Sequence, residues 1–251
     1  MRVTIITVCK NAQDTIERTI RSVIDQDYPD IEYLIIDGGS TDKTLDIINK
    51  YQEKIDTVTS EPDKGLYYAM NKGIERSKGE VIYFLNSGDM LFKTNTISNV
   101  VKAFEKNHVD IIYGDIALYN PDQPQKLILR SQKNISNFFL GHDTIYHQSI
   151  FTKKYIFEKY GGFDTQFKLV ADYDWILRSL IKHKISNYYL KLTMAKFLRG
   201  GLSFNESESI KERFRVLLRY YSPAQVVLNG FLFWLIHRLL VKINRELFSK
   251  G

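Results

Sequence analysis

Short apolar segments alternate with helical patterns through the first half of the chain. The apolar segments have the length of buried strands, and they cover residues 3–8, 33–36, 57–60, 81–85 and 111–113. The segments between them place apolar residues on one helical face, at residues 16–24, 45–51, 66–77 and 97–106. Alternation of this kind is typical of βαβ units. It predicts an α/β fold with a mostly parallel central sheet.

The start of the first helix and the later part of the chain give further signals. Asp14 and Glu17 have the spacing of a capping box, which predicts that the first helix begins beside them. Between residues 128 and 197 the periodicity weakens, and only two helices are clearly predicted, at 155–160 and 172–184.

Composition places the chain among globular proteins with one sizeable core, since 44% of its 251 residues are hydrophobic and 25% are charged. The formal net charge of +6 suits an acidic partner: a nucleotide, a nucleic acid or an anionic membrane. The single cysteine, Cys9, lies in the apolar first strand, which predicts a reducing compartment and a core role for the thiol. The start, MRVTIITVCKN, lacks the pattern of a signal peptide, so we do not expect export by that route.

Carboxylates stand where strands or loops end. Asp37 follows the second strand in IIDGGSTD, Asp89 follows the fourth in LNSGDM, and Asp172 and Asp174 lie in LVADYDW. Because parallel strands end at one edge of a sheet, we expect the first two carboxylates to converge. Such a pair suits hydrogen bonding of a nucleoside or coordination of a hard divalent cation. Capping of turns is the alternative for each of them.

Basic and polar residues share the predicted edge. Lys10 and Asn11 follow the first strand, Lys64 lies in another loop, and Arg199 lies in RGGLSF. Lys64 and Arg199 are candidates to neutralise a diphosphate. DGGSTD does not match the G-x-G-x-x-G fingerprint and the chain has no G-x-x-x-x-G-K-[ST] loop, which argues against dehydrogenases and nucleoside triphosphatases.

Three longer stretches resemble family 2 glycosyltransferases of the GT-A fold, especially bacterial enzymes that build surface polysaccharides. They are TIITVCKNAQDTIERTIRSVIDQDYPDIEYLIIDGGSTDKT, SEPDKGLYYAMNKGIERSKGEVIYFLNSGD and GGFDTQFKLVADYDWILR, within roughly residues 1–205. The resemblance implies a Rossmann-like α/β/α sandwich, a base contact by Asp37, a ribose and metal site at residues 86–89, and a catalytic base at Asp172. The expected nucleotide-binding residues are Thr7, Asn11, Asp37, Lys64, Asn86 and Arg199.

The turn at residues 86–89 departs from the family pattern. Many relatives carry acidic residues where Asn86 and Gly88 stand, so Asp89 is the only carboxylate of the turn. One carboxylate with phosphate oxygens and waters can still hold Mg²⁺. We therefore expect Mn²⁺ or Mg²⁺ at Asp89 and a ribose contact at Asn86, with cationic side chains as the alternative to a metal.

Sugar transfer by inversion requires a base that removes the proton of the attacking hydroxyl. Asp172 opens a predicted helix, whose N-terminal dipole favours the ionised carboxylate that a base needs, and Asp174 is the competing candidate. His142 and His147 lie in GHDTIYHQS. They suit a metal or acid-base pair, or they are loop or acceptor-site residues.

The tail is helical in pattern from residue 206 onward. Within residues 226–248 large apolar side chains cluster, and Arg238, Lys242 and Arg245 repeat on one helical stripe. Polar interruptions argue against a spanning helix, so we predict a basic amphipathic helix in the membrane interface. Packing against the catalytic domain or a second subunit is the alternative.

These patterns predict a GT-A catalytic domain at residues 1–205 and a C-terminal helical, membrane-associating extension at 206–251. The predicted function is inverting transfer from a nucleotide-sugar, expected to be a UDP-sugar, to a hydroxyl of a glycan or lipid-linked acceptor in surface polysaccharide synthesis. The predicted location is the inner face of the bacterial cytoplasmic membrane, without nucleic acid as a partner. A catalytically silent nucleotide-sugar-binding subunit and a sugar nucleotidyltransferase are the alternatives, although the latter normally opens with a glycine-rich, basic phosphate loop that this chain lacks.

Overall fold

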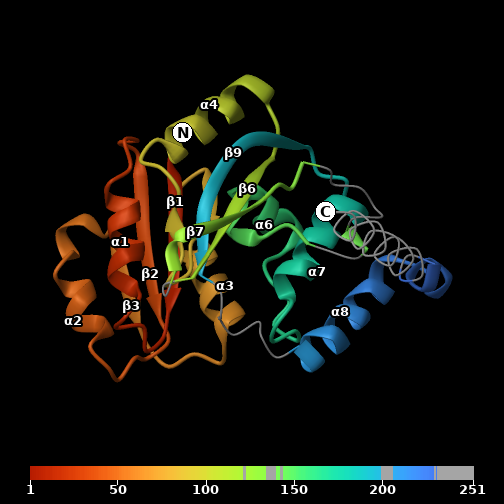
Figure 1. Ribbon diagram of the computed structural model, residues 1–251, viewed down its shortest axis with the longest axis horizontal. Helices are drawn as coiled ribbons and strands as arrows, with labels where there is room; N and C mark the ends of the chain where they lie inside the picture. The colour runs from red at the N-terminus through yellow and green to blue at the C-terminus, as the bar shows by residue number, and fades with distance from the viewer. Residues whose placement is uncertain (121–122, 134–139, 142–143, 199–205, 229, 231–251) are drawn as a thin grey trace, which may run out of the picture.

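The computed structural model describes residues 1–120, 123–133, 140–141, 144–198, 206–228 and 230. In this part of the chain, helices cover both faces of one nine-stranded sheet (Figure 1). No helix among these residues is long and apolar enough to cross a bilayer. Most of the predicted interfacial helix, His142 and Arg199 lie outside the described residues.

The central sheet is mostly parallel, as predicted. Its strands follow the order β3 (Thr57–Ser60), β2 (Ile31–Asp37), β1 (Val3–Cys9), β4 (Val81–Phe84), β8 (Ile150–Lys153), β6 (Ile111–Asn120), β9 (Asn187–Leu198) and β5 (Met90–Leu91), and β7 (Gln123–Arg130) pairs with β6. β1 pairs in parallel with β2 and β4, and β2 with β3. β8 runs antiparallel between β4 and β6, and β6 pairs in parallel with β9.

The helices divide between the two faces, which confirms the predicted α/β/α layers. They are α1 (Ile16–Ile24), α2 (Thr44–Asn49), α3 (Leu66–Arg76), α4 (Thr96–Asn107), α6 (Lys154–Tyr160), α7 (Ala171–Leu177) and α8 (Glu206–Tyr220). Successive strand residues point to opposite faces. In β1, Val3 and Ile5 pack in the core that contains residues of α1 and α4, whereas Ile6 and Val8 pack in the core of α3, α6 and α7.

Two local predictions are wrong. The capping box does not form: α1 begins at Ile16 without a side-chain cap, and the Glu17 carboxylate accepts hydrogen bonds from Arg21 and Tyr51 instead. The strand predicted at 111–113 continues to Asn120, because its second half is also buried and pairs with both β7 and β9.

Helix α8 packs against the domain that precedes it. Val216 is fully buried and belongs to the same core as α7, and the Glu212 carboxylate accepts hydrogen bonds from the backbone N–H groups of Lys168 and Leu169. The boundary predicted between residues 205 and 206 therefore separates elements that share one core.

Candidate functional site

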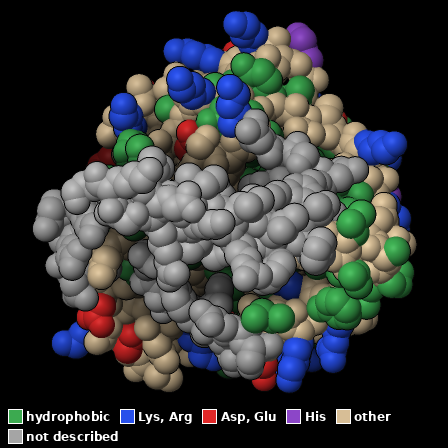
Figure 2. Space-filling view, turned by 45° about the vertical axis from the view of Figure 1, so that its right-hand side comes forward, with side chains coloured by type: hydrophobic (Ala, Val, Ile, Leu, Met, Phe, Trp, Pro, Cys, Tyr) green, Lys and Arg blue, Asp and Glu red, His purple; other side chains and the backbone are tan. Residues whose placement is uncertain are grey.

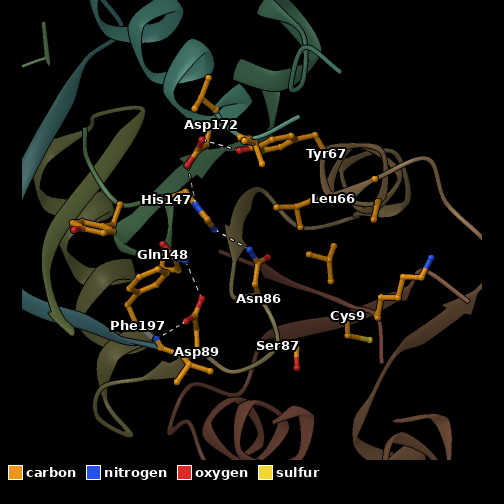
Figure 3. A pocket seen from close by; sticks show the side chains of 18 of the residues that line it. Cys9, Leu66, Tyr67, Asn86, Ser87, Asp89, His147, Gln148, Asp172 and Phe197 are labelled. Carbon is orange, nitrogen blue, oxygen red and sulfur yellow. Dashed lines mark hydrogen bonds and ion pairs between the residues drawn. The ribbon is translucent and has the colours of Figure 1, made fainter. Parts of the chain in front are cut away.

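A cavity of about 820 Å³ opens at the carboxyl ends of β1 and β4 (Figure 3). Five stretches contribute to its wall: residues 8–12, 63–67, 86–89, 144–148 and 169–173. Because β1 and β4 are parallel, their final residues meet at one edge, and Asn11 and Asn86 both line the cavity as the sequence predicted.

Asp172 lies on the cavity wall in the first turn of α7. Its Oδ1 accepts hydrogen bonds from Tyr67 Oη (2.8 Å) and the Tyr173 N–H (2.9 Å), and its Oδ2 lies 3.2 Å from His147 Nδ1. Burial alone would raise the pKa of Asp172, but the hydrogen bonds and the His147 charge outweigh it and leave that pKa below its usual value. Asp172 is thus an ionised carboxylate facing the cavity.

Asp174, the competing candidate, is not among the residues that line the cavity. Its side chain is 1% exposed, and its Oδ1 accepts hydrogen bonds from Tyr220 Oη (2.9 Å) and Arg219 Nη1 (3.2 Å). Both partners belong to α8. Asp174 therefore links α7 to α8, and of the two candidate carboxylates Asp172 is the one that lines the cavity.

The turn after β4 ends in a buried carboxylate that accepts two hydrogen bonds. Asp89 is 4% exposed, and its two oxygens accept hydrogen bonds from Gln148 Nε2 (2.9 Å) and the Leu198 N–H (3.0 Å). Burial raises the pKa of Asp89 to about 6, despite these hydrogen bonds. Gly88 has a φ of +100°, a conformation that strains any other residue, and a Cβ there would also require the Leu198 side chain to move.

A divalent ion fits here only with help from a substrate. The described residues contain no cluster of three or more His, Cys, Asp or Glu side chains that could hold a metal. Asp89 lines the cavity, and each of its oxygens accepts one hydrogen bond and retains further lone pairs. Its carboxylate could therefore be one ligand of an ion whose other ligands are phosphate oxygens and water.

Asp37, predicted to contact the nucleotide base, is not among the residues that line the cavity. Its residue is fully buried, and its carboxylate accepts hydrogen bonds from the Gly39 and Ser40 N–H groups and from the Ser40 and Ser60 hydroxyls. Desolvation acts to raise the pKa of Asp37, but the hydrogen bonds prevail and lower it. Asp37 organises the loop after β2.

Three other predicted nucleotide ligands differ in their placement. Thr7 is fully buried, its hydroxyl pairs with Tyr33 Oη at 3.1 Å, and it is not among the residues that line the cavity. Asn11 lines the cavity in a left-handed conformation with φ of 48°, and its Oδ1 accepts the Thr41 N–H at 2.9 Å. Lys64 is exposed and lies between two cavity residues without itself lining the wall.

Several wall residues have no local sequence signal that marks them. Tyr67 donates a hydrogen bond to Asp172, and Gln148 donates one to Asp89. Arg130 of β7 and Arg213 of α8 add positive charge to the wall. Lys10 supplies a third cation after β1. Lys and Arg side chains also gather along the edges of the face in Figure 2, in keeping with the net charge of +6. The surroundings suit an anionic ligand.

Comparison with known proteins gives consistent matches. The model of the family described as Glycosyl transferase family 2 matches residues 4–161. A PGL/p-HBAD biosynthesis glycosyltransferase of Mycobacterium bovis is 29% identical over 209 residues, which is 77% of this chain and 75% of that protein. The putative teichuronic acid biosynthesis glycosyltransferase TuaG of Bacillus subtilis is 43% identical over 90 residues, which is 35% of this chain and 36% of that protein.

Solved structures share the fold. TarS residues 1–349 from S. aureus give a TM-score of 0.69 at 17% identity, over 86% of this chain and 64% of that one, and have also been solved with UDP and with UDP-GlcNAc. The mannosyltransferase PcManGT of Pyrobaculum calidifontis, solved with GDP-Man and Mn²⁺, gives 0.68 at 17% identity, over 87% and 64%. This chain spans just under two thirds of those two solved chains, and the likeness confirms the predicted architecture.

Proposed function

The chain belongs to glycosyltransferase family 2, and on that premise we propose that it is an inverting transferase with a UDP-sugar as donor. The acceptor in this proposal is a hydroxyl group of a glycan or a lipid-linked sugar in bacterial surface polysaccharide synthesis. Relatives named for PGL/p-HBAD and teichuronic acid biosynthesis support the acceptor class, and the TarS complexes with UDP and UDP-GlcNAc support the donor.

The observation that carries the proposal is the state of Asp172. An acceptor hydroxyl must lose its proton as it attacks the anomeric carbon, and a carboxylate within hydrogen-bonding reach can take it. Asp172 faces the cavity, is held ionised, and keeps an Oδ2 that accepts only the His147 hydrogen bond among those described. The second lone pair of that oxygen is available for the incoming proton.

The leaving diphosphate needs its growing negative charge neutralised. Lys10, Arg130 and Arg213 line the same cavity and provide cationic side chains. In our proposal Asp89 would hold Mn²⁺ or Mg²⁺ together with the diphosphate oxygens, and a bound ion would supply Lewis-acid stabilisation of the leaving group. Asn86 remains our candidate for the ribose contact.

A peripheral membrane position belongs to the same proposal. The basic amphipathic pattern of residues 226–248 would bring the cavity close to a lipid-linked acceptor at the inner face of the cytoplasmic membrane.

The test uses UDP release from a panel of UDP-sugars, because water can replace an unknown acceptor. Asp172→Asn preserves the shape of the side chain and removes the proton acceptor, so turnover should fall about 10²–10⁴-fold. Binding of UDP, measured by calorimetry, should hardly change. NMR of the released sugar should show an inverted anomeric centre. Retained configuration, or full activity of the folded variant, would refute the assignment.

A further inference from the structure

The His147 ring contacts two other residues of the cavity wall, one with each of its nitrogens. Its Nδ1 lies 3.2 Å from Asp172 Oδ2 on α7, and its Nε2 lies 3.1 Å from Asn86 Nδ2 in the turn after β4. Figure 3 shows the ring between these two side chains. Asn86, which precedes His147 by 61 residues, stands at the predicted ribose site, and Asp172, which follows it by 25, is the proposed base.

The two ring nitrogens of His147 face partners of opposite hydrogen-bonding character. The Asn86 amide nitrogen is a donor, so the ring nitrogen facing it, Nε2, accepts. Nδ1 then carries the proton and donates it to Asp172. In this arrangement the His147 ring accepts a hydrogen bond from Asn86 and donates one to Asp172.

We propose that His147 is a positioning residue that holds the Asp172 carboxylate in its reactive orientation and ties it to the Asn86 turn. This inference rests on the proposed role of Asp172 as the base. If His147 is removed, Asp172 Oδ2 loses its described hydrogen bond in a site where the side chain is only 20% exposed. The carboxylate must then turn toward water or take up a proton, and either change removes the base.

A space-filling role does not account for this ring. His147 stands on the cavity wall with 15% of its side chain exposed, and behind it lies a small apolar pocket that includes Phe84 and Trp175. An aromatic hydrocarbon would fill that position equally well. Two ionisable groups face the His147 ring: Asp172 and, at longer range, Asp89. Tyr67 lies on the far side of the Asp172 carboxylate.

Two substitutions divide the functions of the ring. The amide nitrogen of asparagine occupies the place of Nδ1, so His147→Asn keeps a donor toward Asp172 and loses the contact with Asn86. Glutamine reaches the place of Nε2, so His147→Gln keeps the contact with Asn86 and loses the donor. A hydrogen bond to a charged group is worth about 10-fold to 100-fold in an equilibrium or rate.

The experiment measures kcat and the donor KM for UDP release, with folding checked by circular dichroism. His147→Gln and His147→Ala should lower kcat about 10-fold to 100-fold with little change in donor KM. His147→Asn should keep kcat within about threefold of the parent and raise donor KM. Equal losses of kcat in the Asn and Gln variants, or parent-like kcat in His147→Ala, would overturn the inference. If the Gln variant does not fold, the contrast between the Asn and Ala variants decides.

The double variant His147→Ala/Asp172→Asn separates this inference from the proposed function. If His147 acts through Asp172, its replacement should cause no further loss of kcat once the carboxylate is gone. If it acts independently, the two losses of kcat should add. An added loss would overturn the positioning role. High activity in Asp172→Asn alone would instead refute the base, and the proposed function with it.

Discussion

Replacing Asp174 should weaken the attachment of α8 without removing the chemistry. Asp174→Asn keeps the size of the side chain and an oxygen that can accept from Tyr220, but it removes the negative charge that faces Arg219. A hydrogen bond to a charged group contributes about 1.5–3 kcal/mol. The lower part of this range applies because Arg219 is 40% exposed and also binds Asp164 at 2.7 Å.

The loss should appear as a lower Tm in a calorimetric scan. At about 2–4 °C per kcal/mol for a chain of this size, Asp174→Asn should melt roughly 3–6 °C below the parent. Turnover measured well below that temperature should remain near that of the parent. A double-mutant cycle with Arg219→Gln should give a coupling of about 1 kcal/mol between the two sites. An unchanged Tm, or loss of turnover in a fully folded variant, would show that Asp174 has a different role.

Four further outcomes follow from the structure. In Asp89→Asn the Gln148 amide can rotate, so that its Oε1, a buried atom without a hydrogen-bond partner, accepts a hydrogen bond from the new amide. The variant should therefore fold but lose transfer activity. If Asp89 binds a metal, exhaustive chelation should reduce the activity of the parent. Because burial raises the pKa of Asp89 to about 6, the contribution of this group to stability is present below about pH 4 and is lost as the pH rises through about 6. In melting scans from pH 4 to 8, the Tm of Asp89→Asn should therefore rise relative to that of the parent. Parallel curves of Tm against pH would contradict this. Asp37→Ala leaves two N–H groups, two hydroxyls and the Cys9 thiol without their acceptor and should lower Tm, in contrast to replacement of a surface aspartate such as Asp46. An unchanged Tm would contradict the organising role. Truncation after Ser222 should abolish flotation with anionic liposomes at low salt, and a parent that fails to float would refute the membrane proposal.

The alternation of strands and helices could be predicted because it depends on local hydrophobic period. Each βαβ unit places its own apolar residues on one face of a helix or in a buried run, and the order of β1, β2 and β4 follows from parallel connections. Asp172 could be placed at a helix start by the same reasoning and by family resemblance. What fails locally is the capping box, where a contact with Tyr51 on another element competes successfully for Glu17.

The roles of the other carboxylates depend on partners far away in the sequence. Asp89 is bound by Gln148 and Leu198, which are 59 and 109 residues distant, and Asp174 by residues 45 and 46 positions later. No local pattern shows whether a strand-end aspartate meets solvent or a buried donor. Asp37 illustrates this point, because its carboxylate stands at a strand end and accepts hydrogen bonds from the loop that follows β2.

The docking of α8 has a consequence for how the protein matures in a cell. The ribosome synthesises the sheet and α7 before α8. Until α8 emerges, its buried residue Val216 is missing from the core that α8 shares with α7. A nascent or prematurely ended chain would present that apolar surface to its surroundings, where chaperones and proteases recognise incompletely folded proteins. Arg213 of the same helix also lines the cavity, so docking of α8 both covers the core and adds this part of the cavity wall.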